Sequence, residues 1–197
     1  NNTAMGYSAV AENIAGGHNT GFGAYALQNN SASYNTAVGS LALLSNTTGE
    51  RNLAFGYAAY TASDTENDNL AIGYEAMTTN TAGGTGNIAI GNYAMDALTS
   101  GDYNTAVGYQ SGGKITTGVE NTAVGYQSTI ENTAGDGKTA FGHQSGMNNT
   151  ANYTTFIGWE AGRDSTTCTG TVGIGAQCMQ DGTQTGNYNT GVGHQAM

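Results

Sequence analysis

The sequence predicts an all-β fold, a parallel β-solenoid of about 12 coils that each contain 16–18 residues. The first supporting observation is a repeat, because residues 104–111 are identical to residues 121–128. The second is a glycine that recurs at intervals of 16, 17 or 18 residues along the whole chain. A fixed short period of this kind is typical of a solenoid. These glycines, called coil glycines below, are Gly6, Gly23, Gly39, Gly56, Gly73, Gly91, Gly108, Gly125, Gly142, Gly158, Gly175 and Gly193.

The third observation is that large and small residues alternate before each coil glycine, which indicates a β-strand. Positions are counted from the coil glycine, so Val124 is at position −1 and Thr122 at position −3. Position −1 is always large and apolar, and position −3 is β-branched or aliphatic, as strands favour. Position −2 is Ala or Gly in eleven of twelve coils, and only Phe156 breaks this column. Such a small face permits another backbone to approach closely, so we expect a neighbouring subunit to cover it.

Two further columns indicate how the strands are joined. Position −4 is Asn in nine coils, and stacked Asn side chains form ladders between strands. Its exceptions are Lys138, Thr154 and Thr171. Position +3 is Ala, Ser or, once, Cys, which fits inside a narrow turn. We expect two short strands and two turns per coil, with one second strand at 41–44, linkers at 45–49 and 80–86, and no helix.

Composition and charge narrow the class of partner. The chain has 32 Gly, no Pro, 9% charged residues and a formal charge of −10. Nucleic acid and anionic membranes are therefore poor partners. No apolar run approaches the roughly 18 residues of a membrane span. The chain has no initiator Met or signal peptide at Asn1 and ends within a repeat, so we expect residues 1–197 to be one repeat domain of a longer fibrous protein.

The core Asn-[Thr/Leu/Ile]-Ala-[Val/Ile/Phe]-Gly, with a small residue at position +3, resembles the repeat of the YadA-like heads of trimeric autotransporter adhesins. The form Asn-Thr-Ala-Val-Gly-Tyr-Gln is similar to repeats of phage tail-fibre proteins. The resemblance covers the whole chain and implies a left-handed parallel β-roll that assembles as a homotrimer, with positions −3 and −1 filling the interior. The long repeats, the Tyr-Gln pair and the breaks at Phe156, Gly173 and Gly191 favour a viral fibre over a bacterial adhesin.

Two short motifs have a chemical interpretation that the repeat disfavours. Residues 21–26 and 191–196 approach a dinucleotide-binding fingerprint, but that fingerprint requires a helix after the glycines, and none is expected here. His143 and His194 share position +1 three coils apart, so one chain cannot bring both to one metal ion, whereas three copies of one His would meet on a trimer axis if that column faced it. We interpret them as replacing Tyr at a surface or interface, and His18 lies outside the column.

The remaining reactive residues do not form a site in the sequence. Cys178 occupies the small position +3, which indicates a buried thiol, although a disulfide with Cys168 stays open for an extracellular protein. The acidic stretch 64–68 lacks the spacing and glycine of a calcium loop, so we interpret it as a solvated turn. No Ser-His-Asp set or paired carboxylates recur in one place. The sequence therefore predicts no enzyme, no cofactor, and no catalytic or metal residue.

Aromatic residues recur at position +1, and their role is open between structure and binding. As structure they form a ladder between coils, and as a binding stripe they stack on sugars of a host surface. We favour the structural role. These residues are Tyr7, Tyr57, Tyr74, Tyr109, Tyr126 and Trp159.

These observations predict a rigid trimeric shaft of a viral tail fibre or cell-surface adhesin, located outside the cell and supporting attachment to a host glycan or receptor. The alternative is a glycan- or ice-binding solenoid that uses a flat repeat face. Against the ice-binding alternative, Thr recurs mainly at position −3, which the resemblance places in the interior.

Overall fold

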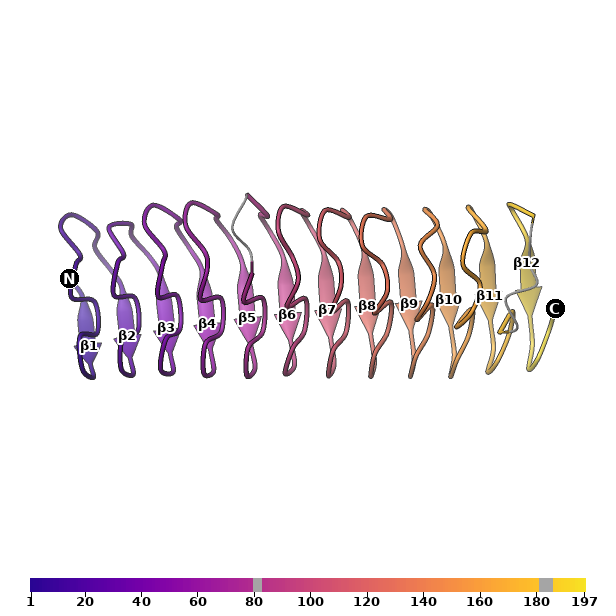
Figure 1. Cartoon of the computed structure of the whole chain (residues 1–197), viewed down its shortest axis with the longest axis horizontal. Helices are drawn as coiled ribbons and strands as arrows, with labels where there is room; N and C mark the ends of the chain where they lie inside the picture. The colour runs from indigo at the N-terminus through magenta and orange to yellow at the C-terminus, as the bar shows by residue number, and fades with distance from the viewer. Residues whose placement is uncertain (80–82, 181–185) are drawn as a thin grey trace.

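The computed structural model describes residues 1–79, 83–180 and 186–197, which form a parallel β-solenoid. Its twelve strands lie side by side in chain order in one sheet, and the two chain ends lie at opposite ends of the long axis (Figure 1). The strands are β1 (Thr3–Met5), β2 (Thr20–Phe22), β3 (Thr36–Val38), β4 (Leu53–Phe55), β5 (Leu70–Ile72), β6 (Ile88–Ile90), β7 (Thr105–Val107), β8 (Thr122–Val124), β9 (Thr139–Phe141), β10 (Thr155–Ile157), β11 (Val172–Ile174) and β12 (Thr190–Val192). The predicted fold class is confirmed.

Strand pairing keeps every repeat position aligned with its counterpart in the next coil. Between β7 and β8, for example, Ala106 pairs with Ala123 and Val107 with Val124. The ladder extends past the strand, because the N–H of Gly125 donates to the carbonyl of Val107 at 2.8 Å. Each column of the sequence therefore becomes a straight row of side chains along the solenoid.

The second strand predicted at 41–44 is wrong, because each described coil has one three-residue strand and a wall of turns opposite it. In this wall, positions +2 and +4 adopt the left-handed conformation, as at Leu41 (φ 63°) and Leu43 (φ 50°). The N–H of Leu41 donates to Ala24 of the preceding coil, and that of Leu43 donates to Ala59 of the following coil, at 2.9 and 3.1 Å. Hydrogen bonds between coils thus hold the wall without the extended backbone of a strand.

The coil glycine is required where the strand meets this wall. Gly125 has φ 132°, a conformation that side chains rarely adopt. A Cβ atom added to Gly125 would lie 2.3 Å from the carbonyl oxygen of Gly142, the next coil glycine. The stacked coils therefore exclude a side chain at this position.

The predicted orientation of the strand faces is also wrong, since the small residues point inward and the large ones outward. Ala106 and Ala123 at position −2 are fully buried, whereas Phe55 and Phe141 at position −1 are 54% and 53% exposed. The physical reason is the narrowness of the coil. The turn wall also sends side chains from positions +3 and +4 into the same space, which leaves room for about a methyl group from the strand.

The column at position +4, which the sequence analysis missed, supplies the large core side chains. It contains the fully buried residues Leu27, Leu43, Tyr60, Met77, Met95 and Met179. The sequence shows this column as apolar or glycine in every coil except the one that contains Thr129. A left-handed residue that also points inward, however, matches neither a strand pattern nor a helix pattern.

The predicted Asn ladder at position −4 is confirmed. The side-chain oxygen of Asn104 accepts the backbone N–H of Asn121 at 3.0 Å, while its amide donates to the carbonyl of Gly118 at 2.8 Å. The same pattern links Asn87 to Asn104 on one side and Asn121 to Lys138 on the other. Each buried Asn therefore satisfies backbone groups that the turns leave unpaired.

Candidate binding surfaces

The outer face of the sheet carries a continuous apolar column at position −1. Its residues belong to all twelve strands, and none of them is buried. They are Met5, Phe22, Val38, Phe55, Ile72, Ile90, Val107, Val124, Phe141, Ile157, Ile174 and Val192. Because folded monomers rarely expose large contiguous apolar patches, this row marks the outer strand face as a candidate interaction surface.

Position −3 lies on this same outer face and changes character along the solenoid. It is aliphatic in β4, β5 and β6, where Leu53, Leu70 and Ile88 stand beside the position −1 column. In eight other strands it is Thr, half-buried or exposed. The face is therefore most apolar at β4–β6 and carries hydroxyl groups toward both ends.

A second exposed surface follows the coil glycines, where aromatic rings of successive coils contact one another. The run extends from Tyr57 to Trp159 with centroid separations of 5.1–6.3 Å, and it passes through Tyr74, Tyr93, Tyr109, Tyr126 and His143. Tyr109 and Tyr126 are nearly parallel, at 9°, yet 43% and 44% exposed. The sequence-predicted ladder therefore exists, and it leaves much of each ring open to solvent.

Glutamine side chains at position +2 form a second ladder beside the rings. Gln127 donates from its amide to the side-chain oxygen of Gln110 at 2.9 Å, and Gln144 donates to Gln127 at 3.0 Å. Gln195 and Gln177 repeat the pattern at 3.1 Å near the end of the chain. This feature was not predicted, although Gln at position +2 in successive copies of the repeat is a visible signal for it.

The histidines are placed within aromatic contacts. His143 stacks between Tyr126 and Trp159, and His18 stacks on Tyr34 with an interplanar angle of 2°. His194 is exposed at position +1 of the last coil. In the described part of the chain, no three His, Cys, Asp or Glu side chains are grouped to hold a metal ion.

The two cysteines retain thiols and are buried. Cys178 lies at position +3 as predicted, with its sulfur 3.3 Å from the carbonyl oxygen of Ala196, and burial raises its pKa. The question of a disulfide with Cys168 is thus answered in favour of two thiols.

The acidic stretch 64–68 is held by hydrogen bonds between its own residues and by an ion pair with the preceding coil. Glu66 is buried, and its carboxylate accepts the backbone N–H groups of Asp64 and Thr65 at 2.8 and 3.1 Å. Asp68 accepts two hydrogen bonds from Arg51 of the preceding coil, which lower the pKa of the Asp68 carboxyl. These exposed ion pairs add little stability.

Lys138 is the most unusual ionisable residue, because it occupies the buried Asn column. Its side chain is fully buried, and its amine donates to the carbonyl oxygen of Asn149 at 2.5 Å. Burial lowers the pKa of Lys138 to about 7, and the negative charge of Asp136 opposes the shift. The amine lies inside the coil, away from both exposed surfaces.

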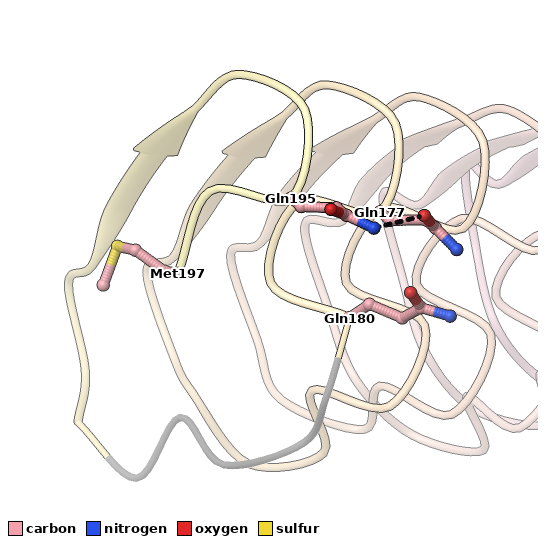
Figure 2. A pocket seen from close by; sticks show the side chains of 4 residues that line it. All are labelled: Gln177, Gln180, Gln195 and Met197. Atoms are coloured by element: carbon pink, nitrogen blue, oxygen red, sulfur yellow. Dashed lines mark hydrogen bonds between the residues drawn. The ribbon is translucent and has the colours of Figure 1, made fainter.

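A pocket of about 340 Å³ lies at the end of the stack, lined by Gln177, Gln180, Gln195 and Met197 (Figure 2). Figure 2 shows the Gln177 and Gln195 side chains of successive coils next to each other, joined by their hydrogen bond.

The near-fingerprint glycines at 21–26 and 191–196 follow the repeat register, in strands β2 and β12 and the turns after them. The described ranges contain no helix long and apolar enough to cross a membrane. Comparisons with protein-family models, curated proteins and solved structures gave no match.

Proposed function

We propose that this chain is a rigid segment of an extracellular attachment fibre, a viral tail fibre or a cell-surface adhesin, in which three copies associate through their outer strand faces. The observation that carries the proposal is the exposed apolar column at position −1. It stays in phase over twelve strands, although nothing in the coil itself requires large apolar residues there. Burial of such residues against another subunit is favourable, at roughly 25 cal/mol per Å² of apolar surface.

The partner that fits this face best is another copy of the same chain. A second copy presents the same apolar rows at the same spacing, so side chains of the two sheets meet in register along their length. The resemblance of the repeat to trimeric adhesin heads favours a three-fold arrangement of these faces about one axis. Strands β4–β6 would form the most apolar part of this interface.

The solenoid also suits a mechanical role. Consecutive coils are joined by backbone hydrogen bonds between the strands and between the turn walls, and by hydrogen bonds of buried Asn side chains. A rod stiffened along every edge holds two distant ends apart. Its role would be to present a separate receptor-binding region, or its own surface, to the host.

The test is the solution mass, measured by light scattering during size-exclusion chromatography. We expect a mass equal to three copies of the 20.0-kDa chain. The double variant Ile72→Lys/Ile90→Lys should be monomeric with an unchanged circular dichroism spectrum, because it charges the outer face alone. The matched control Thr117→Lys/Thr133→Lys adds the same charge on exposed turns and should remain trimeric. A wild-type monomer would contradict the proposal.

A second candidate, ice binding, gains one specific observation. Thr residues at position −3 lie on the flat outer face, and the sequence-based argument that they fill the interior is wrong. The candidate requires this face to remain free, so it competes directly with self-association. Thermal hysteresis in a monomeric sample would favour ice binding, and its absence together with a trimer mass would exclude it.

A further inference from the structure

The edge that follows the coil glycines carries a second repeating surface that the shaft does not use. We call it the edge track, and it combines one aromatic ring and one amide from each of three coils. Its members are Tyr109, Tyr126 and His143 at position +1 and Gln110, Gln127 and Gln144 at position +2. Trp159 of the next coil continues the ring row, 6.3 Å from His143.

The amide ladder of the edge track retains hydrogen-bonding capacity. A glutamine amide has two N–H donors and two acceptor lone pairs. Gln127 uses one donor toward Gln110 and one lone pair toward Gln144. One donor and one acceptor therefore remain on the Gln127 amide, beside the ring of Tyr126, which is more than two-fifths exposed.

The ring row sets the spacing and the apolar part of this surface. Ring centroids are 5.7 Å apart between Tyr109 and Tyr126 and 5.1 Å apart between Tyr126 and His143. This spacing is close to the length of one sugar residue in an extended chain. A pyranose presents an apolar ring and a rim of hydroxyl groups that both donate and accept, which matches the ring and amide of each coil.

Charge distinguishes a sugar polymer from other polymers that stack on aromatic rings. None of the six members of the edge track is Asp, Glu, Lys or Arg, whereas the chain as a whole carries a formal charge of −10. Single-stranded nucleic acids also stack on aromatic rows, but they need a basic groove, and the edge track contains no Lys or Arg. Glu160, which occupies position +2 of the next coil, is buried and bonded by Arg163 and Gln180.

From these observations we propose that the edge track binds a linear neutral polysaccharide, one sugar residue per coil, with the sugar rings against the aromatic row and hydroxyl groups on the glutamine amides. The proposal does not depend on trimer formation. The track lies beyond the coil glycine, off the strand face that mediates self-association.

Calorimetric titration of the whole chain tests the proposal with four hexasaccharides. Three are neutral, β-1,4-linked glucose, α-1,4-linked glucose and β-1,4-linked N-acetylglucosamine, and one is anionic hyaluronan. We expect at least one neutral hexasaccharide to bind and to change the fluorescence of Trp159, the one tryptophan of the chain. Hyaluronan should not bind, because the net negative charge of the chain repels it.

Matched variants locate the binding. Tyr126→Ala and Gln127→Met should each weaken binding about tenfold, as expected for loss of one stacking or polar contact. Tyr153→Ala and Gln28→Met change the same residue types at other positions, and they should leave affinity within about twofold. Circular dichroism and solution mass should be unchanged in all four.

The opposite results are equally clear. Absence of binding by all three neutral hexasaccharides, equal binding of hyaluronan, or equal loss in Tyr126→Ala and Tyr153→Ala would overturn the proposal. Because Gln127→Met removes polar atoms without shortening the side chain, it tests the track even if Tyr126→Ala unfolds. A trimer that binds no sugar would contradict the edge-track proposal alone. A monomer that binds sugar would contradict the trimeric-shaft proposal alone.

Discussion

The phenyl ring of Phe156 occupies the space that a side chain at Gly162 would need. A Cβ atom at Gly162 would lie 2.3 Å from the Phe156 ring, and one at Gly173 of the next coil would lie 2.9 Å from it. Phe156 is the one large residue at position −2, and Gly162 is one of the few glycines at position +4. The two exceptions thus compensate each other, because one core volume is supplied from the strand instead of the turn wall.

This exchange of volume predicts a non-additive pair of substitutions. Phe156→Ala alone should lower the free energy of unfolding by about 3–5 kcal/mol, since it leaves a cavity. Gly162→Met alone should also destabilise, because the ring blocks the new side chain. The double variant restores the Ala and Met found at Ala71 and Met77, and it should recover at least half of the loss. Urea denaturation measures all three, and simple additivity would refute the volume exchange.

The Asn ladder makes a separate prediction at Asn104. Asn104→Ala removes the acceptor for the N–H of Asn121 and the donor to Gly118, so two buried backbone groups lose a partner. We expect a loss of about 2–6 kcal/mol in the free energy of unfolding, on the basis of roughly 1–3 kcal/mol for each of the two unsatisfied groups. Asn92→Ala, which removes an exposed bond to the N–H of Tyr74, is the control and should cost less than about 1 kcal/mol. Similar losses in both variants would argue against the buried ladder.

Lys138 predicts how stability depends on pH. Its pKa is about 7 in the folded chain against 10.5 ordinarily, so between these values the unfolded chain binds a proton that the folded chain does not. Stability should therefore rise with pH across this window and fall as the pH drops toward 7. Lys138→Asn restores the repeat residue and should flatten this slope. The melting temperatures of both proteins between pH 7 and 10 give the comparison, and identical slopes would contradict the buried amine.

The orientation of the strand is tested at two adjacent residues of β8. Ala123→Leu forces extra volume into the filled interior and should cost about 1–3 kcal/mol or more in the free energy of unfolding. Val124→Leu adds one methylene group on the outer face and should change the stability of the coil by less than about 0.5 kcal/mol. Thermal unfolding under conditions that keep the chain monomeric distinguishes them. A larger loss of stability for Val124→Leu than for Ala123→Leu would indicate that the position −1 residues face the interior, contrary to this fold.

Much of this fold follows from the sequence because a repeat aligns its own columns. The coil glycine, the strand at positions −3 to −1, the Asn ladder and the aromatic ladder were all predictable from residue type and period. Which face of the strand points inward was not predictable, because alternation shows that the two faces differ without showing which one is inside. Leu43 illustrates the missing information, since only its left-handed backbone directs a large side chain into the core and so forces Ala42 and the strand alanines to be small.

The binding surfaces were predictable to a smaller extent. Tyr109 and Tyr126 were identified from their shared position, and stacking was the expected structural role. The glutamine ladder beside them was visible in the repeated Tyr-Gln pair, but its unused donors and acceptors depend on geometry between coils. The outer face was misassigned because the small residues at position −2 were expected to face outward. With the faces corrected, the expected subunit contact moves from position −2 to the large apolar residues at position −1.

Disulfide trapping at neighbouring residues of β7 tests the account most directly. In a Cys168→Ala/Cys178→Ala background, Val107→Cys places a thiol on the outer face, and Ala106→Cys places one in the interior. We predict that mild oxidation links copies of the Val107→Cys chain into covalent dimers, since equivalent residues meet where outer faces pack, and that the Ala106→Cys chain stays unlinked. The reverse pattern, or no linkage in a Val107→Cys chain that elutes as a monomer, would contradict association through the outer strand face.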